Sequence, residues 1–253
     1  NVQNRQIELA VPSVERENLV NGAFLLRSTE PLKPYADNLC VFLEHWASEA
    51  PHRIFLGERN SDGEWVRVTY HTARKQARSI AQNLIDRGLT SDDPVMILSD
   101  NSIAHALLSL GAMFAGIPAV PVSPAYSLIS HDFAKLKHIF STVQPKFIFA
   151  ENGSMFARAV QALDLRDVEI IVAGDAQDDL ESIQFSELIS TVATDDVDRA
   201  LRSVGPDTIA KILFTSGSTG LPKGVLNTHR MLCSNQQAIA QMWPFIEKRP
   251  PVL

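Results

Sequence analysis

The sequence predicts an α/β protein with a doubly wound, mostly parallel β-sheet and flanking helices on both faces. Between residues 95 and 214, short and continuously apolar runs alternate with longer amphipathic segments. Strands buried on both faces need such runs, and parallel strands need a crossover helix between them. The chain has 253 residues, of which 45% are hydrophobic and 21% charged, so it can form a substantial globular core.

Three elements precede the alternating region. A helix, a β-hairpin and an amphipathic helix are predicted over residues 38–50, 53–69 and 73–85. Asn60–Gly63 supplies the turn of the hairpin, because asparagine and glycine favour tight turns. Gly88 is a typical helix stop, since glycine adopts a left-handed backbone at a helix end without strain.

Five apolar strands define the predicted sheet. They are expected at residues 95–98, 119–122, 147–150, 169–173 and 209–214. Helices are expected between them at 102–115, 132–143 and 154–163, with a further short helix near 195–198. The last apolar strand runs into a Gly/Ser/Thr loop, which is followed by a short strand at 224–227 and a helix at 229–242.

Composition and patterning argue against several classes of protein. The net charge of −6 disfavours a general nucleic-acid surface, which needs a clustered basic excess. Pro118 and Pro121 interrupt the apolar run from Ile103 to Val122, so no membrane span is predicted. Cys40 and Cys233 form no paired motif, and the start of the chain has no secretory pattern, which favours a cytoplasmic location.

The histidines do not have the spacing of metal ligands, so no metal site is predicted. Surface or helix-cap roles are favoured for most of them. His229 follows the Gly/Ser/Thr loop closely, and both a helix-start role and a substrate contact stay open for it. The seven histidines are His45, His52, His71, His105, His131, His138 and His229.

The segment Thr215–Gly224 carries the predicted chemistry. It reads Thr-Ser-Gly-Ser-Thr-Gly-Leu-Pro-Lys-Gly and follows a buried strand. Gly217 and Gly220 allow backbone N–H groups to converge on an anion, the hydroxyls add donors, and Lys223 adds a positive charge. This order predicts a polyphosphate-binding loop rather than an incidental Gly/Ser surface loop.

Two other phosphate-binding loops do not fit this segment. A Walker A loop has glycine directly before its lysine and serine or threonine after it, whereas Pro222 precedes Lys223 and Gly224 follows it. A dinucleotide fingerprint has a different glycine spacing and opens a long helix.

The stretch Ile212–Val225 resembles the phosphate-loop signature of the adenylate-forming superfamily. This superfamily contains acyl- and aryl-CoA synthetases, peptide-synthetase adenylation domains and luciferases. Thr228–His229 and the region from Thr69 to Pro121 also resemble it. Three stretches are more similar to the feruloyl-CoA synthetase branch, namely Val14–Glu17, Leu26–Ser28 and Pro121–Leu128.

The resemblance implies an ATP-dependent acid–thiol ligase. Such an enzyme joins a carboxylate to AMP, releases pyrophosphate and then transfers the acyl group to a thiol, usually CoA. ATP, Mg²⁺ and CoA are therefore implied. The implied substrate is a small carboxylic acid, a hydroxycinnamate such as ferulate. A homodimer is left open. Lys223 is implied as the catalytic charge, and the residues implied to hold the ATP phosphates are Thr215, Ser216, Gly217, Ser218, Thr219, Gly220 and Lys223.

Three parts are predicted along the chain. Residues 1–35 are an N-terminal extension, 36–205 a first α/β subdomain, and 206–253 the phosphate loop with the start of a second subdomain. The resemblance places the family's adenine, ribose and magnesium segments and its C-terminal lysine beyond Leu253. The chain is therefore expected to be an incomplete N-terminal domain that forms little acyl-AMP alone. A carrier-protein-loading adenylation domain and a non-catalytic nucleotide-binding module are the alternatives.

Overall fold

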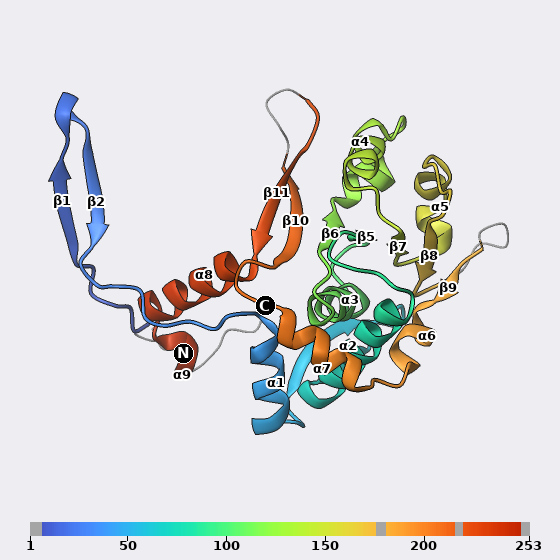
Figure 1. The fold of residues 1–253 in the computed structure, drawn as a ribbon, viewed down its shortest axis with the longest axis horizontal. Coiled ribbons are helices and arrows are strands. Elements are labelled where there is room, and N and C mark those ends of the chain that lie inside the picture. The colour runs from blue at the N-terminus through green and yellow to red at the C-terminus, as the bar shows by residue number, and fades with distance from the viewer. Residues whose placement is uncertain (1–6, 176–180, 216–219, 249–253) are drawn as a thin grey trace. The chain divides into compact units, whose positions relative to one another are not determined.

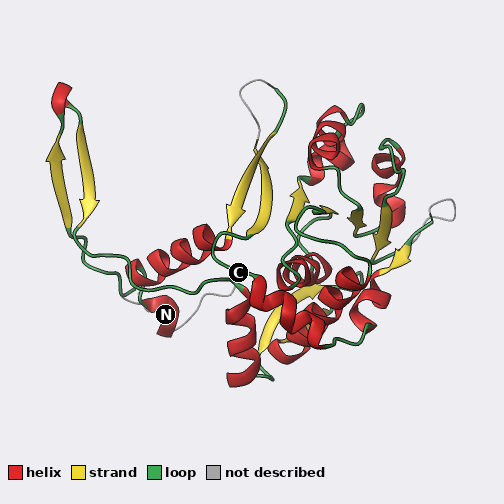
Figure 2. Ribbon diagram, in the orientation of Figure 1, coloured by secondary structure: helices red, strands yellow, loops and turns green. Residues whose placement is uncertain are grey.

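The computed structural model describes residues 7–175, 181–215 and 220–248. The chain divides into two compact units, one formed by Asn38–His229 and the other by Asn1–Asp37 together with Arg230–Leu253. Figure 2 shows that the larger unit combines helices and strands throughout its length. It contains the predicted α/β sheet and the predicted phosphate loop.

A seven-stranded sheet organises the described part of the larger unit, in the order β11-β10-β6-β5-β7-β8-β9 (Figure 1). All neighbouring strands are parallel except β10 and β11, which form an antiparallel hairpin. The strands are β5 (Val95–Leu98), β6 (Ala119–Val122), β7 (Phe147–Ala150), β8 (Glu169–Val172), β9 (Ile183–Gln184), β10 (Ile209–Thr215) and β11 (Lys223–Thr228).

Helices pack on both faces of the parallel strands. The helices of the larger unit are α1 (Cys40–Glu49), α2 (Tyr70–Asp86), α3 (Ile103–Phe114), α4 (Ala134–Val143), α5 (Gly153–Gln161), α6 (Phe185–Ser190) and α7 (Asp195–Ser203). In Figure 1, α4 and α5 lie on one side of the strands, and α2, α3 and α6 lie on the other.

Side-chain alternation explains how both faces become buried. On β7, Ile148 belongs to a buried apolar cluster with Leu136 of α4 and Phe156 of α5. The next residue, Phe149, points to the opposite face, where its ring lies 5.6 Å from the ring of Phe185 in α6. Because successive side chains in a strand point to opposite faces, a strand covered on both sides must be apolar at every position.

Helices α2 and α3 approach each other closely at Gly111. A Cβ atom on this residue would lie 2.4 Å from Cγ2 of Ile80, which is closer than two carbon atoms can pack. Glycine therefore fits this position because of the crossing of two helices, and no left-handed backbone is involved.

Two hairpins lie outside the main sheet. In the larger unit, β3 (Ile54–Arg59) pairs with β4 (Trp65–Thr69). In the smaller unit, β1 (Val14–Asn18) pairs with β2 (Phe24–Ser28) across the short 3-10 helix η1 (Val20–Gly22). The smaller unit also contains most of α8 (His229–Met242) and α9 (Phe245–Lys248).

The predicted fold class is confirmed, and the predicted bounds of β5, β6 and β7 coincide with the observed ones. The pairing of β1 with β2, the β9–α6 segment and the short π-helix η2 (Ala125–Ile129) were not predicted. The division at residue 206 stays a prediction, and β10 and β11 lie in the same unit as the preceding strands.

The apolar run from Ile103 to Val122 is divided between α3 and β6, as the two prolines predict. Across the described ranges, no helix combines the length and apolar character needed to cross a membrane.

Candidate functional site

The predicted phosphate loop connects β10 to β11. Thr215 is the last residue of β10 and pairs with Lys223, the first residue of β11. The exposed side chain of Lys223 therefore stands at the mouth of the loop. Gly220 has a φ of 90°, a left-handed value that glycine adopts without strain. Ser216, Gly217, Ser218 and Thr219 lie outside the described residues, so their assigned roles remain predictions.

The loop leaves the sheet at the edge where ligands bind in open α/β folds. Strand β10 runs parallel to β6, with Lys211 opposite Ala119, so Thr215 emerges toward the carboxyl side of β6. The carboxyl ends of β5, β6 and β7 are in register there, because Leu98 pairs with both Val122 and Ala150. Crevices outside these strand ends are the usual ligand sites of parallel sheets.

Packing holds the two strands of the hairpin close together beside the loop. A Cβ atom on Gly224 would lie 3.3 Å from Cγ2 of Ile212 and 3.3 Å from Cζ of Phe214. Phe214 is half-buried and packs against the core cluster beneath α4 and α5. The incoming end of the loop is therefore tied to the core through an aromatic side chain.

A histidine contacts the outgoing end of the loop. The Nε2 atom of His138 lies 3.0 Å from the carbonyl oxygen of Pro222, the residue directly before Lys223. A carbonyl oxygen only accepts hydrogen bonds, so Nε2 carries the proton and donates. No sequence signal pointed to this contact, because His138 and Pro222 are 84 residues apart in the chain.

The turn after β6 borders the same edge of the sheet. Residues Ala125–Ile129 form the π-helix η2, a rare element that is frequent at functional sites. Ser127 is buried, and among the described residues its Oγ atom has no hydrogen-bond partner. Tyr126 packs against the core cluster, and the Lys135 ammonium lies 5.1 Å from its ring centroid.

The segment after β5 caps the next helix. Ser102 accepts a hydrogen bond from the backbone N–H of His105 at 3.1 Å and so caps the N-terminus of α3. The Ser99 hydroxyl lies 2.8 Å from Nδ1 of His105. Burial is the main cause that lowers the pKa of His105 below its usual value, so this imidazole is held neutral near pH 7.

His229 joins the end of β11 to the start of α8, which confirms its helix-start role. Its Nδ1 atom accepts the backbone N–H of Leu39 at 3.1 Å, which requires a neutral ring protonated at Nε2. Nε2 has no hydrogen-bond partner among the described residues. The imidazole is fully buried, and this burial lowers its pKa to about 4.

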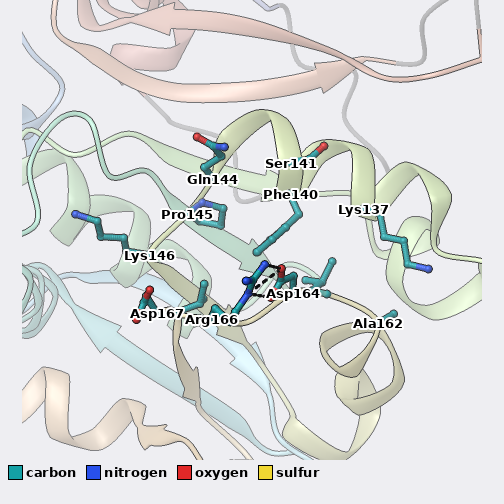
Figure 3. Close-up of a pocket in the computed structure, with 12 residues that line it drawn as sticks. Lys137, Phe140, Ser141, Gln144, Pro145, Lys146, Ala162, Asp164, Arg166 and Asp167 are labelled. Carbon is teal, nitrogen blue, oxygen red and sulfur yellow. Dashed lines mark hydrogen bonds and ion pairs between the residues drawn. The ribbon is translucent and has the colours of Figure 1, made fainter.

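A hollow of about 570 Å³ lies at the amino ends of β7 and β8, on the opposite edge of the sheet from the loop (Figure 3). Its cations already have partners, since Lys146 pairs with Asp93, Arg166 with Asp164, and Lys137 donates to the backbone of Asp132. This hollow is therefore a poorer candidate for a polyphosphate than the exposed Lys223 beside the loop.

Within the described ranges, no group of three histidine, cysteine, aspartate or glutamate side chains is placed to hold a metal ion. No metal ligands are assigned to this chain.

A parallel sheet that delivers a glycine- and hydroxyl-rich loop from a strand end is typical of phosphate-binding α/β proteins. The chain belongs to the AMP-binding enzyme family, whose family model matches residues 43–250. The family is therefore that of the adenylate-forming enzymes, as the motif predicted.

Known proteins similar to this chain in sequence or fold are longer enzymes, of which the chain matches only a part. The chain is 27% identical over 215 residues to the nonribosomal peptide synthetase CymA of Salinispora arenicola, covering 84% of this chain and 2% of CymA. ATP-bound MatB from Rhodopseudomonas palustris has a similar fold, with a TM-score of 0.61, 25% identity, and coverage of 83% of this chain and 38% of MatB.

A fatty acyl-adenylate ligase from L. pneumophila, solved with acyl adenylate and pyrophosphate, also has this fold. The TM-score is 0.60 at 24% identity, and the match covers 81% of this chain and 32% of the ligase. The chain therefore spans less than two fifths of the length of each of these three proteins.

Proposed function

We propose that the protein carrying this chain activates a carboxylic acid with ATP, forming acyl-AMP and pyrophosphate. The observation that carries this proposal is the pairing of Thr215 with Lys223 at the mouth of the glycine- and hydroxyl-rich loop. That pairing brings a hydroxyl and a lysine to the two ends of one loop, at the ligand-binding edge of a parallel sheet. Membership of the AMP-binding enzyme family supports the same reaction.

The residues of this chain act on the leaving group of the proposed reaction. A carboxylate oxygen attacks the α-phosphorus of MgATP, and the bond from that phosphorus to the bridging oxygen of the β-phosphate breaks. The pyrophosphate carries away the electron pair. The Thr215 hydroxyl and the loop N–H groups would hold the β- and γ-phosphates, and Lys223 would balance their charge. Mg²⁺ enters this proposal as part of the MgATP substrate.

The second proposed step uses the thiol of CoA. The sulfur attacks the acyl carbon of acyl-AMP, a thioester forms and AMP leaves. The resemblance of residues 14–17, 26–28 and 121–128 to feruloyl-CoA synthetases supports a hydroxycinnamate as the acid. The first two of these stretches pair with each other, since Glu15 lies opposite Arg27 in the β1–β2 hairpin.

A carrier-protein thiol is the second candidate acceptor. The similarity to the peptide synthetase CymA over 84% of this chain favours it. The activation step and the predicted roles of Thr215 and Lys223 are the same in both cases.

The test uses the full-length protein that carries this chain. ATP–pyrophosphate exchange is measured with ferulate, other hydroxycinnamates, a fatty acid and a set of amino acids. Exchange that depends on ferulate, followed by thioester formation with CoA, is the expected result. Exchange with amino acids and transfer to a carrier protein alone would select the second candidate. Absence of exchange with every acid in the presence of bound MgATP would refute acid activation.

A further inference from the structure

Pro222 at the outgoing end of the loop is buried, but the residues that follow it have little packing of their own. Strand β11 is an edge strand, and its first four residues, from Lys223 to Leu226, are exposed. The backbone hydrogen bonds between β11 and β10 connect this strand to the rest of the sheet. An edge strand with exposed side chains contributes little burial to hold a loop in place.

His138 supplies a contact from the core of the larger unit. It lies on α4 between Leu136 and Ile139, both of which are fully buried in the apolar cluster beneath the helix. Those two neighbours fix the face that α4 turns to the core. The half-buried His138 ring then reaches the carbonyl oxygen of Pro222 at 3.0 Å.

The two ends of the loop are thus connected to one cluster. Phe214, one residue before Thr215, packs directly against it, and Pro222, one residue before Lys223, is held from α4. We propose that His138 is a positioning residue, whose Nε2–H fixes the Pro222–Lys223 peptide so that Lys223 meets the polyphosphate of the nucleotide. This inference rests on the proposed acid activation.

The proposed role does not include proton transfer. In this geometry Nε2 already donates its proton to a backbone carbonyl, so it offers no lone pair to a substrate. A side chain with an N–H at the same place should therefore replace histidine. Glutamine fits this requirement, because its amide nitrogen is as many bonds from Cα as Nε2 of histidine, and it is a good helix former.

The experiment compares His138→Leu with His138→Gln in the full-length protein. Leucine is also a good helix former but has no donor. The exposed His131 supplies matched controls, His131→Leu and His131→Gln. Thermal unfolding verifies that each variant is folded. Amide hydrogen exchange over residues 220–228 is measured first without nucleotide, followed by the Kd of MgATP by calorimetry.

Loss of the donor should loosen the segment and weaken nucleotide binding. In His138→Leu, exchange over residues 220–228 should rise, and the Kd and KM of MgATP should rise by roughly three- to tenfold, the effect of one net hydrogen bond. The KM of the carboxylic acid should stay unchanged. His138→Gln should restore both the exchange rates and the affinity for MgATP, and the His131 variants should match the unsubstituted protein.

Three outcomes would overturn the positioning role. If His138→Leu left both the amide hydrogen exchange of residues 220–228 and the Kd of MgATP unchanged, the hydrogen bond to Pro222 would not hold this segment in place. A fall in kcat with the Kd of MgATP, both KM values and the amide hydrogen exchange of residues 220–228 all unchanged would indicate only a loss of folded protein. Failure of His138→Gln to restore affinity would assign the effect to another property of the ring. If the unsubstituted protein binds MgATP but activates no acid, the proposed function fails, while the exchange and Kd measurements still decide the role of His138.

Discussion

The centre of the sheet and the β10–β11 hairpin belong to the same sheet but differ in what determines their sequences. Every residue of β5 and β7 is buried, whereas the first four residues of β11 are exposed. In the centre, two layers of helices demand apolar side chains at each position. At the hairpin, we propose that the binding of an anion, rather than packing, determines residues such as Thr215 and Lys223. Substitutions in the centre should therefore lower stability, whereas substitutions at the hairpin should lower catalytic activity.

The largest expected effect is on catalysis at the hairpin. Lys223→Ala should lower acid-dependent pyrophosphate exchange by roughly 10²- to 10³-fold, since it removes a charge predicted to stabilise the leaving group. Its melting temperature should be unchanged, because Lys223 is exposed. Lys75→Ala, at an exposed position of α2, is the control and should leave both quantities unchanged. Full exchange activity in Lys223→Ala would remove Lys223 from the proposed mechanism.

The next effect concerns pH and the junction between β11 and α8. Burial lowers the pKa of His229 to about 4 in the folded protein, against an ordinary value of 6.5. As the pH falls from 6.5 toward 4, the unfolded chain binds a proton that the folded chain does not bind. Stability should therefore be lost over this range, by roughly 3 kcal/mol at about 1.4 kcal/mol per pKa unit.

Urea unfolding between about pH 4 and 7.5 measures this loss. His229→Asn keeps an acceptor for the Leu39 N–H but does not titrate, so its stability should depend less steeply on pH. Parallel pH curves for the two proteins would show that another group causes the loss.

A smaller effect is expected for packing in the centre. Gly111→Ala places a methyl group 2.4 Å from Ile80 Cγ2 and should reduce the free energy of unfolding by about 1–3 kcal/mol. Gly205→Ala is the matched control, because a Cβ there has no atom within 4 Å. Combining Gly111→Ala with Ile80→Ala, which removes the Cγ2 atom that the new methyl group would meet, should cost less stability than the sum of the two single substitutions. Equal melting temperatures for the two alanine variants would contradict the close helix crossing.

The smallest effect on stability is expected for the same substitution in the hairpin. A Cβ on Gly224 would meet its neighbours at 3.3 Å, where small shifts of Ile212 and Phe214 can accommodate it. Gly224→Ala should therefore change the free energy of unfolding by less than about 1 kcal/mol. Denaturant unfolding in parallel with Gly111→Ala measures the contrast, and a larger loss in Gly224→Ala would reverse the proposed difference between the regions.

The same contrast explains what could be predicted from the sequence. The bounds of β5, β6 and β7 were predicted correctly because burial on both faces leaves an uninterrupted apolar run. The β1–β2 hairpin was missed because both strands are exposed and mixed in polarity, so no periodicity marks them. The phosphate-binding role of the loop stays a prediction from residue chemistry, and its middle residues lie outside the described ranges.

The remaining site residues could not be predicted because their roles come from contacts between distant segments. His138 has no local signal, and its proposed role follows from where α4 places it beside Pro222. Ser127 is similar, since a buried hydroxyl without a described partner is a property of the folded turn. Local patterns contain no information on such pairs of positions.

The pairing within the β1–β2 hairpin has a consequence for how this protein diverges from its relatives. Glu15 lies opposite Arg27, and Arg27 also forms an ion pair with Glu17 at 3.0 Å. A charge change on one strand alters the surroundings of the other, so substitutions in the two strands should co-vary among homologues. The stretches at 14–17 and 26–28 are then one inherited character rather than two independent ones.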